Sequence, residues 1–141
     1  GNVHIGVNLS PQLYSGYGYI ESRNSNSRII IGNDVWINNN IMLVSEGEGI
    51  VIGAKTLIGH NVEIVDSDFH ALHPNMRMTG RGKTAKVSIG ENVFIGSNVK
   101  ILKGVSIGDN SVIGQGSIVT QSIPADVIAA GNPARVIKSI S

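Results

Sequence analysis

Four histidines carry most of the reactive chemistry of this 141-residue chain, because it contains no cysteine. The absence of thiols excludes disulfide staples and thiolate nucleophiles. An imidazole titrates near pH ~6.5, so a well-placed histidine can take a proton from a substrate at neutral pH. His70 and His73 lie close together in one long segment, and His60 lies shortly before it. These three residues are the candidates for a general base.

The elements that position these side chains follow from a six-residue repeat. From residue 89 the chain reads IGENVF, IGSNVK, ILKGVS, IGDNSV, IGQGSI and VTQSIP, with an aliphatic residue at every sixth position. The same spacing occurs earlier, in residues 31–43 and 52–64. A period of six is a multiple of two and not of 3.6, which predicts strands rather than amphipathic helix.

Each hexamer is predicted to form a short strand and a corner, with three hexamers per coil and coils stacked ~4.8 Å apart. A second, smaller inward position follows each aliphatic residue, at Val93, Val99, Val105, Ser111 and Ser117. Asparagine accepts the left-handed conformation of tight corners, and it stands at Asn33, Asn92, Asn98 and Asn110. A β-sandwich would need hairpin turns and longer alternating runs, which are absent. We therefore expect an all-β parallel β-helix.

The hexamer count also predicts which residues share a face. The aliphatic residues expected on one edge of the prism are Ile37, Ile58, Ile95 and Ile113. The outward residues after them should form one column, made of Asn38, Asn39, His60, Ser97 and Gln115. This column is the expected groove, and the long segment with His70 is expected to fold over it.

Two interruptions break the repeat. Three extra residues occur in SEGEG, and a much longer loop, about 65–86, leaves the coil. A long loop inside a strict solenoid is usually functional. A short C-terminal tail, about 124–141, ends the repeat, and its ARVIKSI is either a last strand or a short helix. Residues 1–28 are less regular, although Val3 to Gly6 looks like one more coil, and we expect residues 1–141 to form a single domain.

Composition narrows the function. The chain is 41% hydrophobic and 15% charged, with a net charge of +1 and scattered basic residues. It is therefore globular and lacks the cluster of positive charge that nucleic-acid binding requires. No apolar stretch approaches ~18 residues and no signal peptide opens the chain, which predicts no membrane insertion. Together with the missing cysteines, this favours a cytoplasmic protein.

Residues 29–138 resemble the hexapeptide-repeat acetyltransferases, most closely the galactoside, maltose and polysaccharide O-acetyltransferase branch. The resemblance rests on INNN, on DSDFHALHP, on the repeats from IGENVF to GSIVT, and on the ending IPADVIAAGNPARVIK. It implies a left-handed β-helix and a homotrimer with active sites between adjacent subunits. It also implies a CoA-dependent O-acetyltransferase that moves an acetyl group directly from acetyl-CoA to a hydroxyl of a saccharide or surface-polysaccharide precursor, with no metal required.

The resemblance also gives roles to single residues. His70 matches the family's catalytic base, whereas His73 is a rival and His60 has no counterpart. The alternative interpretation of His70 is a loop histidine that packs on Phe69 or bonds the backbone.

On the acceptor side, the resemblance implies roles for an asparagine and for an acidic residue. Asn38 matches a family asparagine of the active site that hydrogen-bonds the acceptor, with Asn39 and Asn40 as close competitors. Glu46 matches an acidic residue that contacts the sugar. Asparagine at a corner is also ordinary turn chemistry, and exposed acidic residues often have no specific partner.

For acetyl-CoA, Ser97 and Gln115 match positions whose backbone contacts the pantetheine arm, and the Ser97 N–H is a candidate oxyanion donor. The pantetheine and adenine end is matched by Thr120, Gly131, Asn132, Pro133, Arg135 and Lys138. Arg135 and Lys138 are suited to phosphates, or are simply solvated basic residues.

Three other functions occur on this fold. An antibiotic (xenobiotic) acetyltransferase shares the mechanism, and the loop ALHPNMRMTGRGKT does not identify the acceptor. A metal-dependent enzyme like the γ-carbonic anhydrases would need three converging histidines, a spacing that His4, His60, His70 and His73 do not reproduce. A non-catalytic scaffold would leave the histidine loop unexplained.

Overall fold

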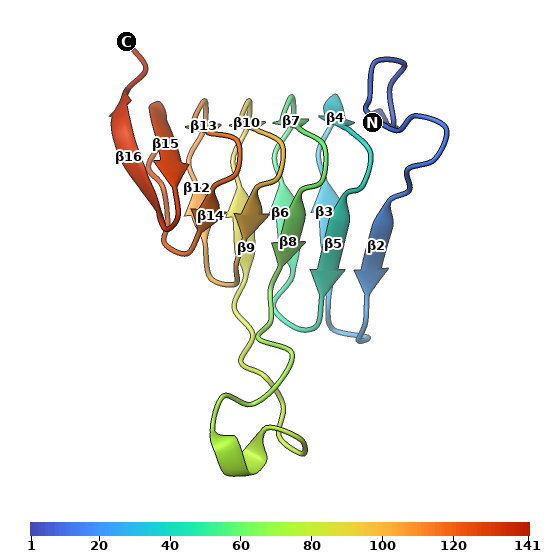
Figure 1. The fold of residues 1–141 in the computed structure, drawn as a ribbon, viewed down its shortest axis with the longest axis vertical. Coiled ribbons are helices and arrows are strands. Elements are labelled where there is room, and N and C mark those ends of the chain that lie inside the picture. Colours follow the sequence, from blue (N-terminus) through green and yellow to red (C-terminus); the bar gives the residue numbers. More distant parts are fainter.

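A computed structural model describes all residues, 1–141, and shows a prism of stacked strands (Figure 1). Three sheets, named A, B and C here, form its sides. Sheet A contains β1 (Val3–Ile5), β4 (Val35–Ile37), β7 (Leu57–Ile58), β10 (Phe94–Ile95), β13 (Val112–Ile113), β15 (Val127–Gly131) and β16 (Ala134–Ser139). Sheet B contains β2 (Tyr19–Ser22), β5 (Met42–Ser45), β8 (Glu63–Val65), β11 (Lys100–Ile101) and β14 (Ile118–Val119). Sheet C contains β3 (Ile29–Ile31), β6 (Ile50–Ile52), β9 (Val87–Ile89) and β12 (Ser106–Ile107).

The predicted parallel β-helix and its face assignment are confirmed by the strand register. On sheet A, Ile58 pairs with Ile37 on one side and with Ile95 on the other, and Ile95 pairs with Ile113. On sheet C, β6 pairs in register with β9 although the long loop separates them in sequence. The interruptions therefore leave the coil without changing the face count.

The core is a column of aliphatic side chains inside the prism. It comprises 23 buried residues, all of them Ile, Val, Leu or Ala. Full burial of one such large side chain stabilises the fold by about 1.5–3 kcal/mol. The smaller inward positions are buried as predicted, and the two serines among them find partners: Ser111 Oγ donates to the Pro124 carbonyl, and Ser117 Oγ accepts from the Gly131 N–H.

Two corners of the prism matter for the site. Corner AB joins sheet A to sheet B through residues 38–41, 59–62, 96–99 and 114–117. Corner BC joins sheet B to sheet C through residues 46–49, 66–86, 102–105 and 120–122.

Asparagine takes the left-handed conformation at most of the predicted corner positions. Asn92, Asn98 and Asn110 have φ of 56°, 59° and 60°. Asn33 also lies at a corner, between β3 and β4, but the positive φ of that corner, 57°, belongs to Asp34. In IGNDV the left-handed position is the fourth of the hexamer, so Asn33 stands one residue too early.

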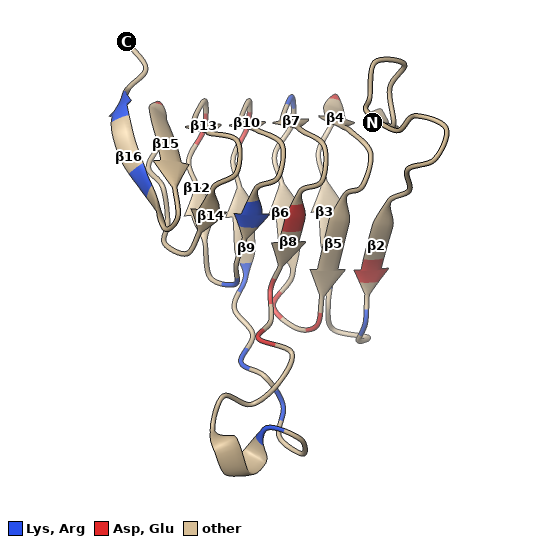
Figure 2. Cartoon of the chain, viewed as in Figure 1, with Lys and Arg blue, Asp and Glu red and all other residues tan.

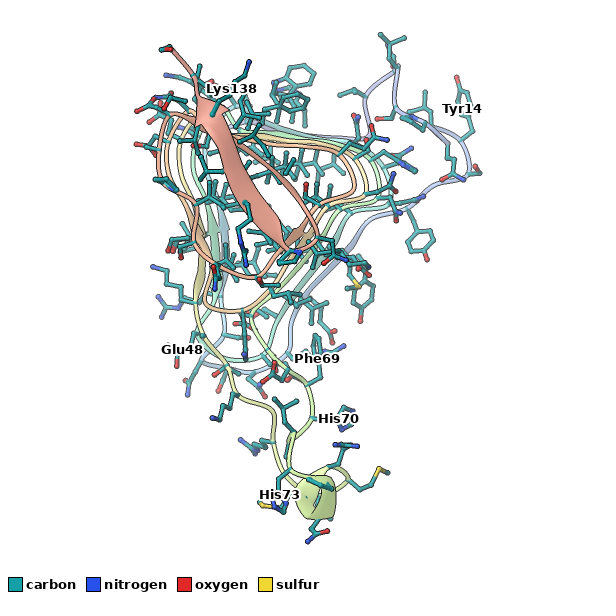
Figure 3. The ribbon with its side chains drawn as sticks, turned by 60° about the vertical axis from the view of Figure 1, so that its left-hand side comes forward. Tyr14, Glu48, Phe69, His70, His73 and Lys138 are labelled. Carbon is teal, nitrogen blue, oxygen red and sulfur yellow. The ribbon has the colours of Figure 1, made fainter.

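The long loop and both ends complete the molecule. Residues 66–86 project away from corner BC (Figures 1 and 3), so the expectation that the loop folds over corner AB is wrong within one chain. The C-terminal segment is a strand, because β16 pairs antiparallel with β15. The N-terminal coil is confirmed, since β1 pairs with β4. No helix has the length and apolarity needed to cross a membrane.

Candidate active site

The projecting loop is a two-stranded ribbon with a short helical tip, η1 (Pro74–Met76). Two antiparallel bridges join its arms: Ser67 with Thr84, and His70 with Arg81. At the root of the ribbon, Lys103 Nζ of the next coil lies 3.2 Å from Asp68 Oδ1. The ribbon thus holds His70 at a defined place outside the prism (Figure 3).

His70 is exposed, and one of its ring nitrogens is engaged. Its Nδ1 lies 3.2 Å from the carbonyl oxygen of Arg77. A carbonyl only accepts, so this bond requires the proton on Nδ1 and leaves the Nε2 lone pair free. Arg77 is held in turn by its own guanidinium, which donates to the Leu72 carbonyl at 3.0 Å. This tautomer is the one that a general base at Nε2 needs.

The residue before His70 has an unusual backbone. Phe69 has φ of 62°, and the His70 N–H donates to the Asp68 carbonyl two residues back, at 2.7 Å. These are the features of a γ-turn with positive φ, a conformation that costs a bulky residue about 1–3 kcal/mol. The Phe69 N–H donates to Ser67 Oγ at 2.8 Å. A Cβ at Gly82 would lie 2.6 Å from the Phe69 nitrogen, so glycine is needed opposite the turn.

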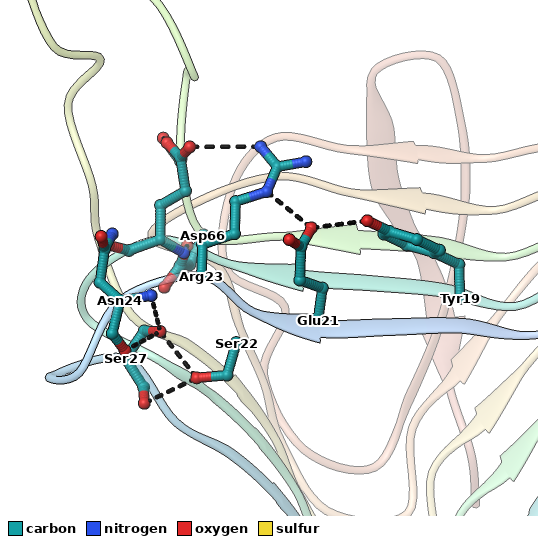
Figure 4. Close-up of polar contacts among 9 residues, drawn as sticks. Tyr19, Glu21, Ser22, Arg23, Asn24, Ser27 and Asp66 are labelled. Atoms are coloured by element: carbon teal, nitrogen blue, oxygen red, sulfur yellow. Dashed lines mark hydrogen bonds and ion pairs between the residues drawn. The ribbon is translucent and has the colours of Figure 1, made fainter.

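Charged residues are frequent at corner BC and along the ribbon (Figure 2). Arg23 binds two carboxylates, with its Nε 2.7 Å from Glu21 and a terminal nitrogen 3.2 Å from Glu46 (Figure 4). The bond to Glu21 raises the pKa of Arg23, and Glu46 adds to that effect. The bonds from Arg23 and from the Tyr19 hydroxyl lower the pKa of Glu21. Glu46 also accepts from Ser67 Oγ at 2.7 Å, so its carboxylate is already bonded within the chain.

Below this cluster, a fully buried carboxylate shapes the SEGEG turn. Asp66 accepts hydrogen bonds from the Ser45 hydroxyl and from the backbone N–H groups of Glu46, Gly47 and Gly49. No cation pairs with Asp66, so its charge is balanced by N–H and O–H dipoles alone. The SEGEG turn also packs on the ribbon, because a Cβ at Gly47 would lie 2.6 Å from Thr84 Oγ1.

Corner AB carries the three asparagines of INNN, and they differ in freedom. Asn39 is buried, and its amide donates to the carbonyls of Pro11 and Gln12. Asn40 lies 3.2 Å from His60 Nε2. Asn38 is half-buried and only accepts, from Ser10 Oγ at 2.9 Å, so its amide nitrogen is free. The structure leaves Asn38 as the asparagine best able to bind a further group.

The expected column at corner AB is present, but including Asn38 in it was wrong. Backbone hydrogen bonds link its successive coils, from the Asn61 N–H to the Asn39 carbonyl and from the Asn98 N–H to the His60 carbonyl. Asn38 lies one residue before the column. The Ser97 N–H donates to no protein acceptor, whereas Ser97 Oγ accepts from the His60 N–H at 3.1 Å. The β15–β16 turn lies over the same corner, because Gly131 bonds Ser117 there.

The residues expected to bind acetyl-CoA therefore fall into two groups. Ser97, exposed Gln115 and the exposed segment 131–133 form a row along corner AB. Arg135 is exposed on β16 opposite Ala130, close to that row. Lys138 pairs farther along β15, and Thr120 is exposed at corner BC, so neither joins the row within one chain.

Asn38 and His70 lie at different corners of the same chain. The largest of the main hollows, about 510 Å³, runs along sheet C past Ser88, Ser106 and Ser122 and contains neither residue. No three or more His, Asp or Glu side chains are grouped so that they could hold a metal ion. One chain thus presents two candidate half-sites, His70 with acidic neighbours at corner BC and a row of polar backbone at corner AB.

Comparison with known proteins identifies the family. Residues 86–121 match the hexapeptide repeat of succinyl-transferase. The chain is 42% identical over 133 residues to the galactoside O-acetyltransferase of Escherichia coli K12, covering 94% of the chain and 61% of that protein. It is 31% identical over 149 residues to WbbJ of the same organism, named a lipopolysaccharide biosynthesis O-acetyl transferase, covering 98% and 72%. The chain belongs to the hexapeptide-repeat acetyltransferase family.

The fold is accordingly the family's left-handed parallel β-helix. A solved galactoside acetyltransferase in complex with coenzyme A aligns with a TM-score of 0.80 and 40% identity, over 99% of this chain and 64% of that one. The chain spans 61% of the E. coli galactoside O-acetyltransferase that it matches.

Four residues around this candidate site were not predicted from the sequence as site residues: Arg23, Asp66, Ser67 and Phe69. Three of them lie in DSDF, directly before His70, and that adjacency was the available signal. Arg23 had none, because the irregular first coil hides its register with Glu46.

Proposed function

We propose that the chain is a CoA-dependent O-acetyltransferase that moves an acetyl group from acetyl-CoA to a saccharide hydroxyl. The observation that carries the proposal is His70, held on a ribbon with Nδ1 bonded to a carbonyl and Nε2 free. Its relatives are named for galactosides and for lipopolysaccharide biosynthesis, which supports a saccharide or surface-polysaccharide precursor as acceptor.

The transfer needs no acyl-enzyme. His70 Nε2 takes the proton of the acceptor hydroxyl while that oxygen attacks the thioester carbonyl carbon. The carbonyl oxygen becomes negatively charged, and the Ser97 N–H, which has no protein acceptor, donates to it. The carbon–sulfur bond then breaks, the new ester forms, and the imidazolium returns its proton to the departing thiolate.

The remaining residues bind the two substrates. Asn38 donates its free amide to an acceptor hydroxyl, and Glu46 accepts from another through a lone pair that Arg23 and Ser67 leave open. The pantetheine arm follows the row from Ser97 and Gln115 to the turn of Gly131, Asn132 and Pro133. Thr120, Arg135 and Lys138 contribute to the adenine and phosphate end.

The separation of the two half-sites supports a shared site in a homotrimer. Sheet A carries an outward apolar column in which Trp36, Leu57 and Phe94 are paired in register and 44%, 47% and 49% exposed. Exposed contiguous apolar surface of this kind marks an interface. In the proposed trimer a second copy covers this column, and corner AB of one chain lies beside the ribbon of the next, so that Asn38 meets His70.

We expect light scattering at micromolar concentration to give about three times the chain mass of 14.8 kDa. Phe94→Glu should dissociate the assembly, because it puts a charge into the apolar column. Ile30→Glu is the matched control, an exposed apolar residue on the outer face of sheet C. A monomeric wild type, or dissociation by Ile30→Glu alone, would contradict this arrangement.

The reaction itself is tested by release of the CoA thiol from acetyl-CoA with different acceptors. We expect release with galactosides or oligosaccharides, because amide and carboxylate groups at Asn38 and Glu46 suit vicinal hydroxyls. Release with chloramphenicol and none with saccharides would favour an antibiotic acetyltransferase.

Thermal denaturation tests whether the chain binds the acetyl donor. Acetyl-CoA at ~100 times its Kd should stabilise the fold by about 2.7 kcal/mol through mass action. A shift with Zn²⁺ and none with millimolar acetyl-CoA would instead favour a metal-dependent hydratase.

A further inference from the structure

Side chains from three successive coils meet at the root of the ribbon, between the prism and His70. Arg23 comes from the end of β2, Glu46 from the SEGEG turn after β5, and Ser67 and Phe69 from the root of the ribbon after β8. They are linked by side-chain contacts rather than by the strand ladder. Figure 4 shows the Arg23 part of this network with its carboxylate partners.

We propose that Arg23 is a positioning residue for His70, acting through Glu46, Ser67 and the Phe69 turn. The inference rests on the proposed acetyltransferase function and deepens it, because it explains how an exposed loop keeps its base in one place.

The first step is the placement of Arg23 itself. Its guanidinium is held between Glu21 and Glu46, and the Tyr19 hydroxyl braces Glu21 from the other side at 2.8 Å. In this position its central carbon lies 5.2 Å from the centre of the Phe69 ring. That separation is within the range of a cation–π contact.

The second step runs from Glu46 to the backbone of Phe69. The Ser67 hydroxyl donates to Glu46 Oε2 at 2.7 Å and accepts from the Phe69 N–H at 2.8 Å. Because a hydroxyl has a single proton, donation to Glu46 directs its lone pairs toward Phe69. Glu46 and Arg23 thus hold both the ring and the N–H of Phe69.

The third step is from Phe69 to His70. A phenylalanine adopts a φ of 62° only when its surroundings impose it. Once the Phe69 contacts are lost, the turn can relax to ordinary φ, and the Cα of His70 moves with it. His70 is the next residue, so any relaxation changes the direction of its ring toward the acceptor.

The network lies outside the aliphatic core, so an effect on the position of His70 can be distinguished from an effect on folding. None of its members belongs to the 23-residue core, and Arg23 is 38% exposed in its side chain. Removing the Arg23 side chain should therefore leave the coil intact. A purely structural role would instead lower stability and activity together.

The experiment compares Arg23→Ala with Lys55→Ala, which removes an exposed cation of another coil paired with Glu91 at 3.0 Å. We expect Arg23→Ala to lower kcat by roughly 10- to 100-fold, the effect of displacing a reacting group by about 1 Å. The acetyl-CoA KM and Tm should stay near wild type, and Lys55→Ala should change none of these. Arg23→Lys should restore only part of kcat, because an ammonium lacks the planar fork.

Two further measurements do not depend on turnover. Amide hydrogen exchange at Phe69 and His70 should become at least about tenfold faster in Arg23→Ala, while the amides of β10 and β13 keep their wild-type rates. In Arg23→Ala/Phe69→Leu, kcat should be no lower than in the worse single variant, because both changes break one path.

A kcat within twofold of wild type in Arg23→Ala would overturn the proposal. So would a loss of kcat without faster exchange at Phe69, because Arg23 would then act on the acceptor directly. If the wild-type chain transfers no acetyl group to any acceptor, the proposed function fails by itself. The exchange rates would still decide whether Arg23 holds the ribbon, since unchanged rates would refute that link independently.

Discussion

Replacing His70 by alanine is expected to lower kcat by roughly 10²–10⁴-fold, the usual contribution of a positioned general base. The side chain is exposed on the ribbon and its only hydrogen bond is to the Arg77 carbonyl, so Tm and acetyl-CoA affinity should change little. Steady-state kinetics with the preferred saccharide, together with thermal denaturation, measure both effects.

Two other histidines serve as controls for this prediction. His73 is exposed at the tip of the ribbon, and His60 bonds Asn40 and Gln12 at corner AB. His73→Ala and His60→Ala should each lower kcat by less than about tenfold. The acidic limb of the pH–rate profile should disappear in His70→Ala and persist in both controls. A larger loss in His73→Ala would identify a different base, and loss of folding in His70→Ala would return His70 to a structural role.

Replacing Asp66 by asparagine is expected to cost the fold about 3 kcal/mol or more, because hydrogen bonds to a buried charged acceptor are individually strong. Asp66 is fully buried and accepts from Ser45 Oγ and from three backbone N–H groups. The amide of an asparagine would face at least one of these donors with another donor. Chemical denaturation of variant and wild type at the same protein concentration measures the loss.

The matched control is Asp109→Asn. Asp109 is exposed and accepts from the Glu91 N–H at 2.8 Å, a bond that an asparagine oxygen can keep. Its effect should stay within about 0.5 kcal/mol. An Asp66→Asn variant as stable as Asp109→Asn would show that the SEGEG turn does not depend on the buried charge. Weakening the SEGEG turn in Asp66→Asn should also make Glu46 more mobile. The kcat of the folded variant should therefore be lower than that of wild type, in addition to the loss of stability.

Much of the fold could be predicted because its information is local and repeated. The six-residue spacing of Ile89, Ile95, Ile101 and Ile107 determines which side chains enter the core. It also determines the vertical register, since Ile95 can stack only on residues of the same face, as Ile58 and Ile113 do. The long loop and its histidine were visible as a departure from that repeat. The resemblance of residues 29–138 to the acetyltransferases then indicated which histidine to choose.

Only the tertiary structure decided how the site is held. The positive φ of Phe69, the contact of His70 Nδ1 with the Arg77 carbonyl and the burial of Asp66 have no periodic signal, because each depends on groups that meet from different coils or across the ribbon. Arg23 lies 23 residues before Glu46 in an irregular coil, so no hexamer count places them together. The hexamer count places the start of the loop after β8, at corner BC, but it does not give the direction of the loop, which runs away from the prism instead of over corner AB. A repeat specifies the coil that each residue occupies, whereas the path of a loop depends on side-chain contacts made outside the repeat.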